Sequence, residues 1–546
     1  EPRRRGIRRF RRFERRPLAG SGDDGGDDDD ESRLPSPPHH RTTPARWFIL
    51  LSYFLLAMFQ NMTFNTYSPI YPAVSKAFPS WTPSFLDWSV NTSNIAYLLF
   101  IYPASLMYER WDVRQITLFA ATMVFIGAAV RCVPVSDGPL QLGITIASMV
   151  LNGIGATWMG FGGPVIAERW FPVEERTLAT ALCAIVAPFS GTAVGFVLGP
   201  LFAGSDAALD EKAARMRVDR LFWAEAALCL TALVCCVAYF PDRPEHPPSE
   251  AAAACAERKR QKVIREETGA LSASSDGSNG EEEIFDVQEE GEERLLYHDA
   301  EEDNIPAGVK VYFGFSDSSV NAPPAGAIAK YWAMCLGIAF PLGVSQGWGS
   351  VLYSILAPLG ATEGQAAILG FASTSAGCFG ALAVGAALGQ CTGRLKAASV
   401  SCMAIAAVSF LLFSADASGY FPFLSSDVAA GLAFVTCVIA GATFSASVPL
   451  YFELMFENSH GWADAGAGVM MSSFLSATVQ IAFTAALALQ GPGESTLWTS
   501  WAAAGSAILG CVALLGVRVE YRRLSVDQGT ALSWTGCRFD REFGCY

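Results

Sequence analysis

Twelve apolar segments, each about 20 residues long, recur along this chain of 546 residues. An α-helix needs about 20 consecutive apolar residues to cross the hydrocarbon layer of a membrane. One long polar stretch, at about 241–328, separates the first six segments from the last six. The pattern therefore predicts an all-α membrane protein with twelve transmembrane helices in two six-helix halves.

The predicted spans and the polar stretches between them define five regions. The first two spans lie at about 47–71 and 88–107, and the third ends at residue 130. The other nine lie at about 143–166, 177–202, 221–240, 332–356, 366–388, 397–414, 428–452, 465–490 and 498–517. The regions are a disordered N-terminal tail at 1–46, a first bundle at 47–240, a disordered acidic loop at 241–328, a second bundle at 329–517 and a C-terminal tail at 518–546. Acidic blocks of this kind are usually solvated and build no core.

Composition favours a membrane protein and argues against several other classes. Charged residues make up only 16% of the chain, against about 25% in a typical soluble domain. The sequence has no Gly-rich phosphate loop with a lysine, no legible catalytic Ser/His/Asp arrangement and no zinc-like cysteine spacing. All five histidines lie outside the predicted spans. We therefore expect neither an enzyme nor a bound metal or cofactor, and no nucleic-acid partner.

Basic residues near the span ends indicate the orientation of the chain in the lipid bilayer. Cytosolic loops of membrane proteins carry an excess of Lys and Arg. Such residues gather at alternate turns of this chain, namely Arg110, Arg114, Arg169, Arg176, Arg394, Lys396, Arg518, Arg522 and Arg523. We therefore predict that both termini and the acidic loop face the cytosol.

Polar and aromatic residues inside the spans predict a transport pathway. Amides that faced lipid would be unfavourable, so they face the protein interior or a water-filled cavity. The candidate substrate-binding residues are Phe64, Asn65, Tyr67, Asn152, Gln346, Trp348 and Gln480. Aromatic faces would stack on a flat ring or hold a weak cation, while amides would fix its orientation. The alternative is that the rings pack between helices and the amides bridge neighbouring helices.

Glycines in the fifth span predict a close helix–helix contact. Gly191, Gly195 and Gly199 recur every four residues. This spacing lets two membrane helices approach each other closely.

Glu225 is the one acidic residue well inside a predicted span. An ionisable group at such a position is unfavourable unless it has a function or a partner. We predict that Glu225 takes up a proton from an acidic compartment and releases it to the cytosol. The alternative is a solvated or ion-paired residue at the membrane interface, near Arg220. Glu453, at the cytosolic end of the tenth span, is a candidate for gating or for bracing neighbouring helices.

The turn YERWDVR at 108–114 resembles the cytosolic loop signature of major facilitator transporters. In that signature an acid and two basic residues lock helices between conformational states. The resemblance assigns these gating places to Glu109, Arg110 and Arg114. The matching turn of the second half has Gly389 where an acid would be expected.

Further motifs extend over nearly all of the predicted spans. They include NTYSPI at 65–70, RCVP at 131–134, WFPVEERTLATA at 170–181, SVPLYFELMFE at 447–457 and EYRRL at 520–524. With these motifs the chain resembles solute carrier family 49, the family of the feline leukaemia virus subgroup C receptors, and within it the disrupted in renal carcinoma branch. The resemblance implies the major facilitator fold.

The resemblance also implies a substrate and a location. It implies a transporter of the lysosomal membrane that moves pyridoxine, a form of vitamin B6, toward the cytosol together with protons. Relatives carry choline and ethanolamine or were proposed to carry haem, and an aromatic residue near the position of Phe64 contacts their substrate. The branch uses an N-terminal acidic dileucine signal, read by sorting adaptors. Here Glu14 and Leu18 are present, with Ala19 in place of the second leucine, so the plasma membrane is the alternative location.

Three functions are therefore open at the level of sequence. The first is a proton-coupled carrier of a small, flat, weakly basic solute such as pyridoxine. The second is a carrier of choline or a related amine, which would need an aromatic cage and no obligatory hydrogen bonds. The third is a membrane receptor or scaffold without transport activity, whose acidic loop recruits partners. Polar residues inside the spans favour a carrier, because a scaffold has no need of them.

Overall fold

The computed structural model describes residues 43–67, 70–81, 83–203, 210–244, 246–249, 252–253, 326–350, 352–356, 363–388, 392–459, 467–490 and 495–527. All of these residues belong to one compact unit, His40–Tyr546. The N-terminal sorting signal, nearly all of the N-terminal tail and most of the acidic loop lie outside the described residues.

Long helices account for nearly all of the described chain. The first half comprises α1 (Ala45–Phe64), α2 (Tyr71–Ala77), α3 (Pro83–Arg110), α4 (Val113–Val130), α5 (Pro139–Trp170), α6 (Val173–Ala181), η2 (Leu182–Val186), α7 (Ala187–Ala203) and α8 (Glu211–Ala238). The second half comprises α11 (Ala327–Ser350), α12 (Leu352–Leu356), α13 (Glu363–Leu388), η4 (Thr392–Arg394), α14 (Leu395–Ala417), α15 (Ser426–Ser459), α16 (Ala467–Ala488), α17 (Trp498–Gly516) and α18 (Arg522–Asp527). The π-helical turn η2 joins α6 to α7 without a break.

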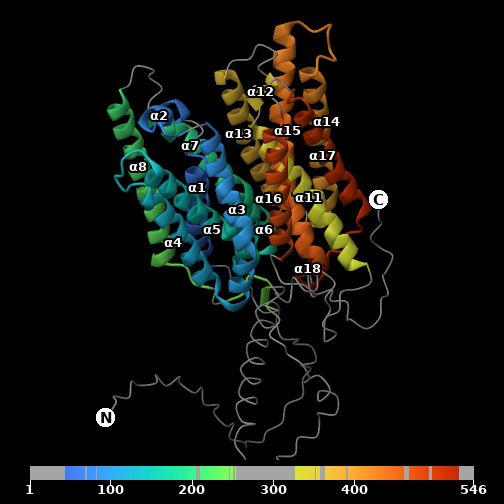
Figure 1. The fold of residues 1–546 in the computed structure, drawn as a ribbon. Coiled ribbons are helices and arrows are strands. Elements are labelled where there is room, and N and C mark those ends of the chain that lie inside the picture. Colours follow the sequence, from blue (N-terminus) through green and yellow to red (C-terminus); the bar gives the residue numbers. More distant parts are fainter. Residues whose placement is uncertain are drawn as a thin grey trace, which may run out of the picture. The chain divides into compact units, whose positions relative to one another are not determined.

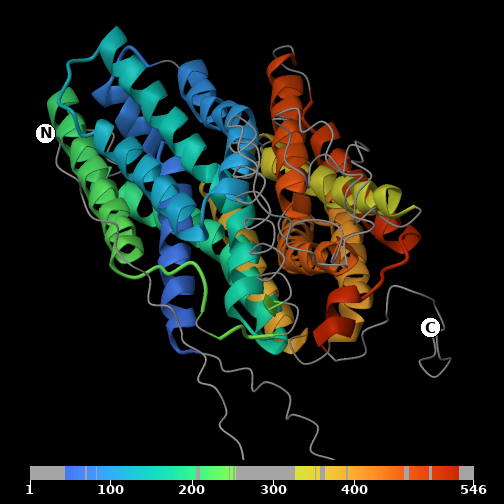
Figure 2. The same ribbon diagram turned by 90° about the horizontal axis from the view of Figure 1, so that it is seen from below.

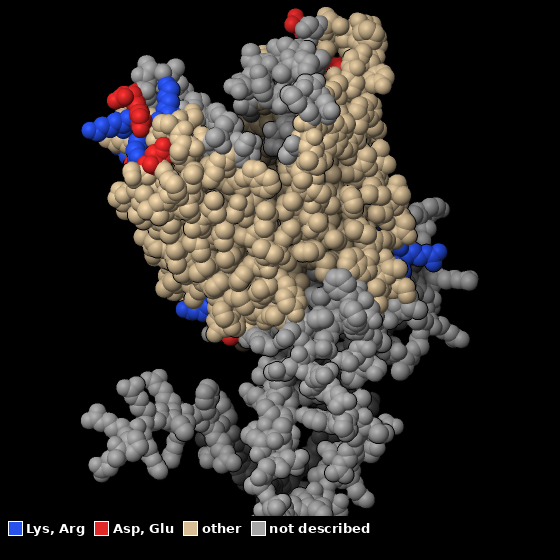
Figure 3. Space-filling model, in the orientation of Figure 1, with Lys and Arg blue, Asp and Glu red and all other residues tan. Residues whose placement is uncertain are grey.

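The predicted architecture of two six-helix halves is confirmed. Eleven helical stretches of the described chain are long and apolar enough to cross a membrane. A further stretch, α3, has 28 residues but carries the polar residues Asn91, Ser93 and Asn94. Figure 3 shows a broad surface band without charged side chains, with Lys, Arg, Asp and Glu gathered toward its ends. Such a band suits a surface in contact with lipid.

The first helix ends earlier than the predicted limit at residue 71. The helix α1 stops at Phe64, and α2 starts at Tyr71 with Pro72 in its first turn. Proline is tolerated there because the first N–H groups of a helix have no partner within the helix. The polar second half of the predicted span therefore forms the end of α1 and a connection rather than more helix.

Residues 241–249 were expected to belong to the disordered loop, but the structure places most of them against the first half. Asp242 pairs with Arg169 at 3.4 Å and accepts a hydrogen bond from the Val113 amide at 2.7 Å. Arg176 donates to the hydroxyl of Ser249 at 3.0 Å. These polar contacts anchor the start of the loop, where the sequence offers no apolar segment to do so.

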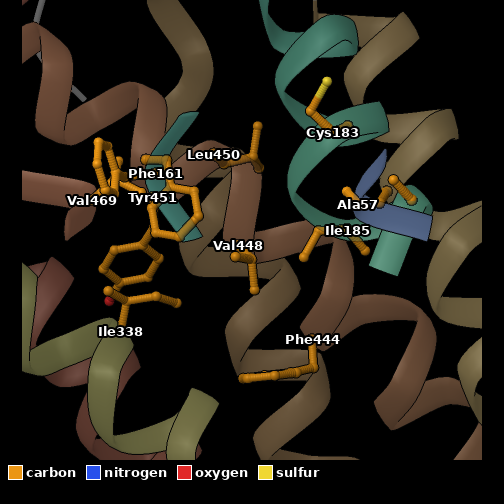
Figure 4. Close-up of a cluster of buried hydrophobic side chains, with 14 of the residues drawn as sticks. Ala57, Phe161, Cys183, Ile185, Ile338, Phe444, Val448, Leu450, Tyr451 and Val469 are labelled. Atoms are coloured by element: carbon orange, nitrogen blue, oxygen red, sulfur yellow. The ribbon is translucent and has the colours of Figure 1, made fainter. Parts of the chain in front are cut away.

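Figures 1 and 2 show the first half in blue to green and the second half in yellow to red, packed side by side. In Figure 1, α2 lies at one end of the bundle and α18 at the opposite end, which we call the α2 end and the α18 end. The halves meet where α6 and η2 pack against α13 and α15, and where α16 packs against α3 and α5. Figure 4 shows part of this apolar core, with Cys183 and Ile185 of the first half and Val448 and Leu450 of the second.

Two hydrogen bonds between the halves lie toward the α18 end. The Thr180 hydroxyl in α6 donates to Glu453 in α15 at 2.7 Å, and the Ser473 hydroxyl in α16 donates to the Gly160 carbonyl in α5 at 3.2 Å. In Figure 3 the surface is hollowed between the two halves at the α2 end. The bundle is therefore joined more closely at the α18 end.

Candidate functional site

Gly191 in α7 allows that helix to lie directly against α1. A Cβ atom at Gly191 would lie 2.0 Å from the carbonyl oxygen of Met58, so a larger residue cannot fit without moving one helix. The contact brings the next residue of α7, Thr192, beside the polar end of α1.

Asn61, Asn65 and Thr192 form a polar group at this contact. The Asn65 amide donates to Asn61 Oδ1 at 2.9 Å and to Thr192 Oγ1 at 3.2 Å, and the Thr192 hydroxyl donates to Asn61 Oδ1 at 3.0 Å. All three side chains are half-buried. Within the described part of the chain, no hydrogen bond uses the Asn61 side-chain N–H groups or the Asn65 side-chain oxygen. The group can therefore offer a solute both donors and an acceptor.

Asn152, a predicted substrate-binding residue, bridges α5 and α1. Its amide donates to Thr63 Oγ1 at 2.6 Å and to the Gln60 carbonyl at 3.2 Å, and its oxygen accepts from Gln60 Nε2 at 2.9 Å. All three side chains are buried. The placement favours the helix-bridging interpretation of Asn152.

Trp348 is likewise packed between helices, in the second half. Its indole N–H donates to the Ser500 hydroxyl at 3.1 Å, and its ring meets those of Phe410 and Phe413 edge-on at 5.5 and 5.3 Å. With only 6% of its surface exposed, Trp348 fits the packing alternative better than a substrate-stacking role.

The other predicted substrate-binding residues fall in different environments. Phe64 in α1 and Gln480 in α16 are half-buried, and Gln346 in α11 is exposed. Tyr67 is buried, with its ring edge-on to Trp81 at 5.6 Å. Only Phe64 and Asn65 lie on the polar end of α1 beside Asn61.

Glu225 lies deep inside the first half, and its partner is Arg131 rather than Arg220. The two side chains are 3.1 Å apart and each is only 2% exposed. The hydroxyl of Thr66, just beyond α1, donates to Glu225 Oε1 at 2.8 Å. Arg131 also donates to the Thr66 oxygen at 3.3 Å. The group therefore ties together the ends of α1 and α4 and the middle of α8.

Aromatic rings complete the surroundings of this ion pair. The Arg131 guanidinium lies 5.8 Å from the ring centre of Tyr67 and 5.3 Å from that of Phe222. Such contacts add cation–π attraction for a buried cation. Arg131 was not predicted as the partner of Glu225, although a basic residue at the end of the third span was a visible signal.

A second buried charge group occupies the α18 end. Arg523 in α18 pairs with Glu453 and, at 3.1 Å, with Glu457, both in α15. The Leu524 amide donates to Glu457 Oε2 at 3.0 Å. Burial alone would lower the pKa of Arg523, but the carboxylates of Glu453, Glu457 and Glu168 raise that pKa above its usual value.

The predicted gating turn is only partly described. The helix α3 continues through Glu109 and Arg110, whose side chains lie outside the described set, and Arg114 is exposed near the start of α4. The acidic residue that contacts this turn is Asp242, which accepts a hydrogen bond from the Val113 amide. Glu453 holds the cross-half contact with Thr180, so of the four gating candidates it is the one with a described contact between the halves.

The chain is similar to known membrane transporters. Residues 49–479 match the Major Facilitator Superfamily. The chain is 25% identical over 499 residues to the solute carrier family 49 member 4 homolog of Xenopus tropicalis, with 88% of this chain and 93% of the relative covered. It is 26% identical over 226 residues to the choline/ethanolamine transporter FLVCR1 of Mus musculus, with 39% of each chain covered.

Solved structures share the fold at low sequence identity. The proton:xylose symporter XylE bound to 6-bromo-6-deoxy-D-glucose matches with a TM-score of 0.61 at 12% identity, covering 89% of this chain and 98% of XylE. The transporter FucP in its outward conformation matches with a TM-score of 0.56 at 11% identity, covering 87% and 99%. The resemblance to solute carrier family 49 is thus confirmed, and the chain belongs to the Major Facilitator Superfamily of membrane transporters.

Proposed function

We propose that this transporter moves a small organic solute by alternating access, and that the solute is pyridoxine, carried from the lysosome to the cytosol together with protons. The observation that carries the proposal is the half-buried group of Asn61, Asn65 and Thr192. The amide N–H groups and the amide oxygen that this group leaves without a described protein partner would be satisfied by water or by a solute.

The chemistry of the group suits a solute with several hydroxyls. Its free amide N–H groups and amide oxygen can pair with hydroxyl groups, and the half-buried ring of Phe64 lies next to Asn65 in sequence. A flat heteroaromatic ring can stack on such a face. Pyridoxine combines both features.

Proton coupling is assigned to Glu225. The titratable or charged groups around its carboxylate are Arg131, Tyr67, Cys132 and Cys229. Uptake of a proton by Glu225 would cancel the charge that holds Arg131 and would loosen the link to the end of α1. The end of α1 carries the solute-binding group, so the proton and the solute would act on one element.

Choline or ethanolamine is the second candidate, because the similar protein FLVCR1 is named for these substrates. A quaternary ammonium needs aromatic faces and no hydrogen-bond donor. Its transport would therefore depend on Phe64 and hardly on Asn65.

The distribution of basic residues supports an orientation with the α18 end in the cytosol. Arg169, Arg176, Arg522 and Lys396 all lie near that end. The lysosomal location rests on the relatives and on the incomplete signal near Leu18, with the plasma membrane as the alternative.

Uptake by cells that display the protein at their surface tests the proposal. Labelled pyridoxine and choline are offered at acidic and neutral external pH. We expect pyridoxine uptake to rise in acid, and Glu225→Gln to remove that rise. Asn65→Ala should raise the KM for pyridoxine about fivefold, since a hydrogen bond contributes about 1 kcal/mol.

Thr231→Ala is the matched control, because its exposed hydroxyl bonds only the Ala227 carbonyl of its own helix. This variant should transport normally. Choline uptake that ignores both pH and Asn65→Ala would select the second candidate. Uptake of neither solute would refute the proposal.

A further inference from the structure

Four buried polar atoms of the first half lack a directed hydrogen bond within the described residues. They are Tyr67 Oη, Arg131 Nε, Gln141 Oε1 and Glu225 Oε2. Each of these residues is at most 3% exposed. Buried polar atoms in proteins are almost always paired with protein groups or with ordered water. These four atoms therefore need partners that the surrounding side chains do not supply.

The four atoms follow one course through the first half. Thr145 and Arg131 are the polar side chains beside the Tyr67 hydroxyl. The Thr145 hydroxyl donates to the Gln141 carbonyl oxygen at 3.1 Å. Gln141 comes four residues before Thr145, so both side chains lie on one face of α5. We call this series the polar route, and its members are Gln141, Thr145, Tyr67, Arg131 and Glu225.

The polar route begins at the α2 end. The Ser80 amide, just beyond α2, donates to Asp137 Oδ2 at 3.0 Å. Asp137 comes directly before the start of α5, and Gln141 lies in the first turn of that helix. The route ends at Glu225, in the middle of α8. Gln141 is therefore the member nearest the α2 end, and Glu225 lies deep in the bundle.

Aromatic rings enclose the polar route between its two ends. The Tyr67 ring meets those of Trp81 and Phe222 edge-on, with 5.6 and 6.2 Å between ring centres. Phe78 stacks on Trp81 at 4.6 Å. Rings packed in this way exclude bulk water and ions. Single water molecules are still held in such a place where they find two to four polar partners.

We infer that bound water molecules join the polar route into a chain that carries protons from the α2 end to Glu225. The inference rests on the proposed proton coupling at Glu225 and gives that coupling an entry route. Gln141 Oε1 accepts a hydrogen bond from water, and Arg131 Nε donates one. The hydroxyls of Thr145 and Tyr67 both accept and donate.

The transfer along the polar route leaves its intermediate members unchanged. A proton from the solution at the α2 end joins the first water, and each water or hydroxyl then passes one proton onward. The Glu225 carboxylate takes the last proton and becomes a neutral carboxyl group. No other covalent bond forms or breaks.

The charges that act on Glu225 come from α4, α8 and the end of α1. Among the described residues, its charged or titratable neighbours are Arg131, Cys132, Tyr67 and Cys229. Asp219, earlier in α8, acts on Cys132. The helix α5 adds only the neutral Gln141 and Thr145 to the polar route. Glu225 is therefore the member of the route that can retain the proton.

Infrared difference spectroscopy of the purified full-length protein tests the inference. Light releases protons from a caged acid, and the C=O stretch of a protonated carboxyl group reports proton uptake. The band that is absent in Glu225→Gln belongs to Glu225. Bands of bound water are identified in the same spectrum by their shift in water labelled with heavy oxygen. We expect such bands, and Tyr67→Phe should remove at least one of them.

Loss of a hydroxyl from the polar route should slow proton uptake without changing its final extent. Thr145→Val should slow the rise of the Glu225 band about tenfold, because the chain loses one hydrogen-bonded member. Thr145→Ser keeps the hydroxyl and should keep the normal rate. Thr157→Val is the matched control farther along α5, since that hydroxyl donates only to the Ile154 carbonyl. If Tyr67→Phe does not fold, the Thr145 variants carry the comparison.

The outcomes separate this inference from the proposed function. Equal rates in all folded variants, or a spectrum without bands of bound water, would overturn the polar route and leave proton coupling standing. A changed final extent at an unchanged rate would indicate a merely structural role and would also overturn it. Absence of any Glu225 band would refute the coupling and the route together. Slowed proton uptake in a protein that does not transport pyridoxine would support the route and contradict only the proposed solute.

Discussion

At the scale of single residues, the pair of Arg131 and Glu225 shows what a membrane interior demands of a charge. Each ion loses its hydration on burial, and attraction to the other offsets that loss only with good geometry and further hydrogen bonds. Here the hydroxyl of Thr66 supplies a hydrogen bond to the carboxylate, and two rings flank the guanidinium. Neither ion is well accommodated without its partner.

Removal of one partner should therefore destabilise the protein more than removal of both. Arg131→Gln and Glu225→Gln should each lower the free energy of unfolding by about 3–5 kcal/mol, because each leaves a buried charge unpaired. The double variant should lose clearly less than the sum of the two. Thermal unfolding of the purified protein in detergent measures all three, and additive losses would contradict the coupling.

The residues that the sequence reveals differ from those that it hides for a physical reason. Glu225 was recognisable because an acid within an apolar run is visible locally. Its partner Arg131 lies far away in sequence and looked like a span-end basic residue. Trp348 and Asn152 were candidates for substrate binding, but the packing that satisfies them comes from Ser500 and Gln60, which no local pattern reveals.

At the scale of elements, the contact of α1 with α7 decides where the polar group lies. The four-residue glycine spacing predicted a close contact, and Gly191 makes one. The spacing could not predict that the partner is α1, nor that Gly195 has more room. A Cβ atom at Gly195 would lie 3.5 Å from the Met62 carbonyl oxygen, which is an ordinary van der Waals distance.

The two glycines therefore form a matched pair for a test. Gly191→Ala should push α7 away from α1, weaken the contacts of Thr192, lower stability by about 1–3 kcal/mol and reduce pyridoxine uptake. Gly195→Ala should change stability and uptake little. Uptake kinetics and thermal unfolding of the two variants check this expectation, which fails if both behave alike.

At the scale of the whole molecule, the division into two halves was predictable from the sequence. The contact that joins the halves at the α18 end was not. Hydropathy alone indicates six spans on each side of the acidic loop, since every span must be apolar. The joining of the halves at the α18 end depends on Thr180, Glu453 and Ser473, which come from distant parts of the chain. Alternating access requires these contacts to break in each cycle.

A reversible cross-link across the α18 end tests that requirement. A Cβ atom at Gly385 in α13 would lie 3.2 Å from the Cβ of Ala181 in α6, close to the separation of about 3.5–4.5 Å found in disulfides. The double variant Ala181→Cys with Gly385→Cys should lose uptake under oxidation and regain it on reduction, because the bond prevents the halves from separating there. The two single variants are the controls, and they should be indifferent to oxidant. Full uptake by cross-linked protein would mean that the halves need not part at the α18 end, and that transport proceeds by a motion other than alternating access.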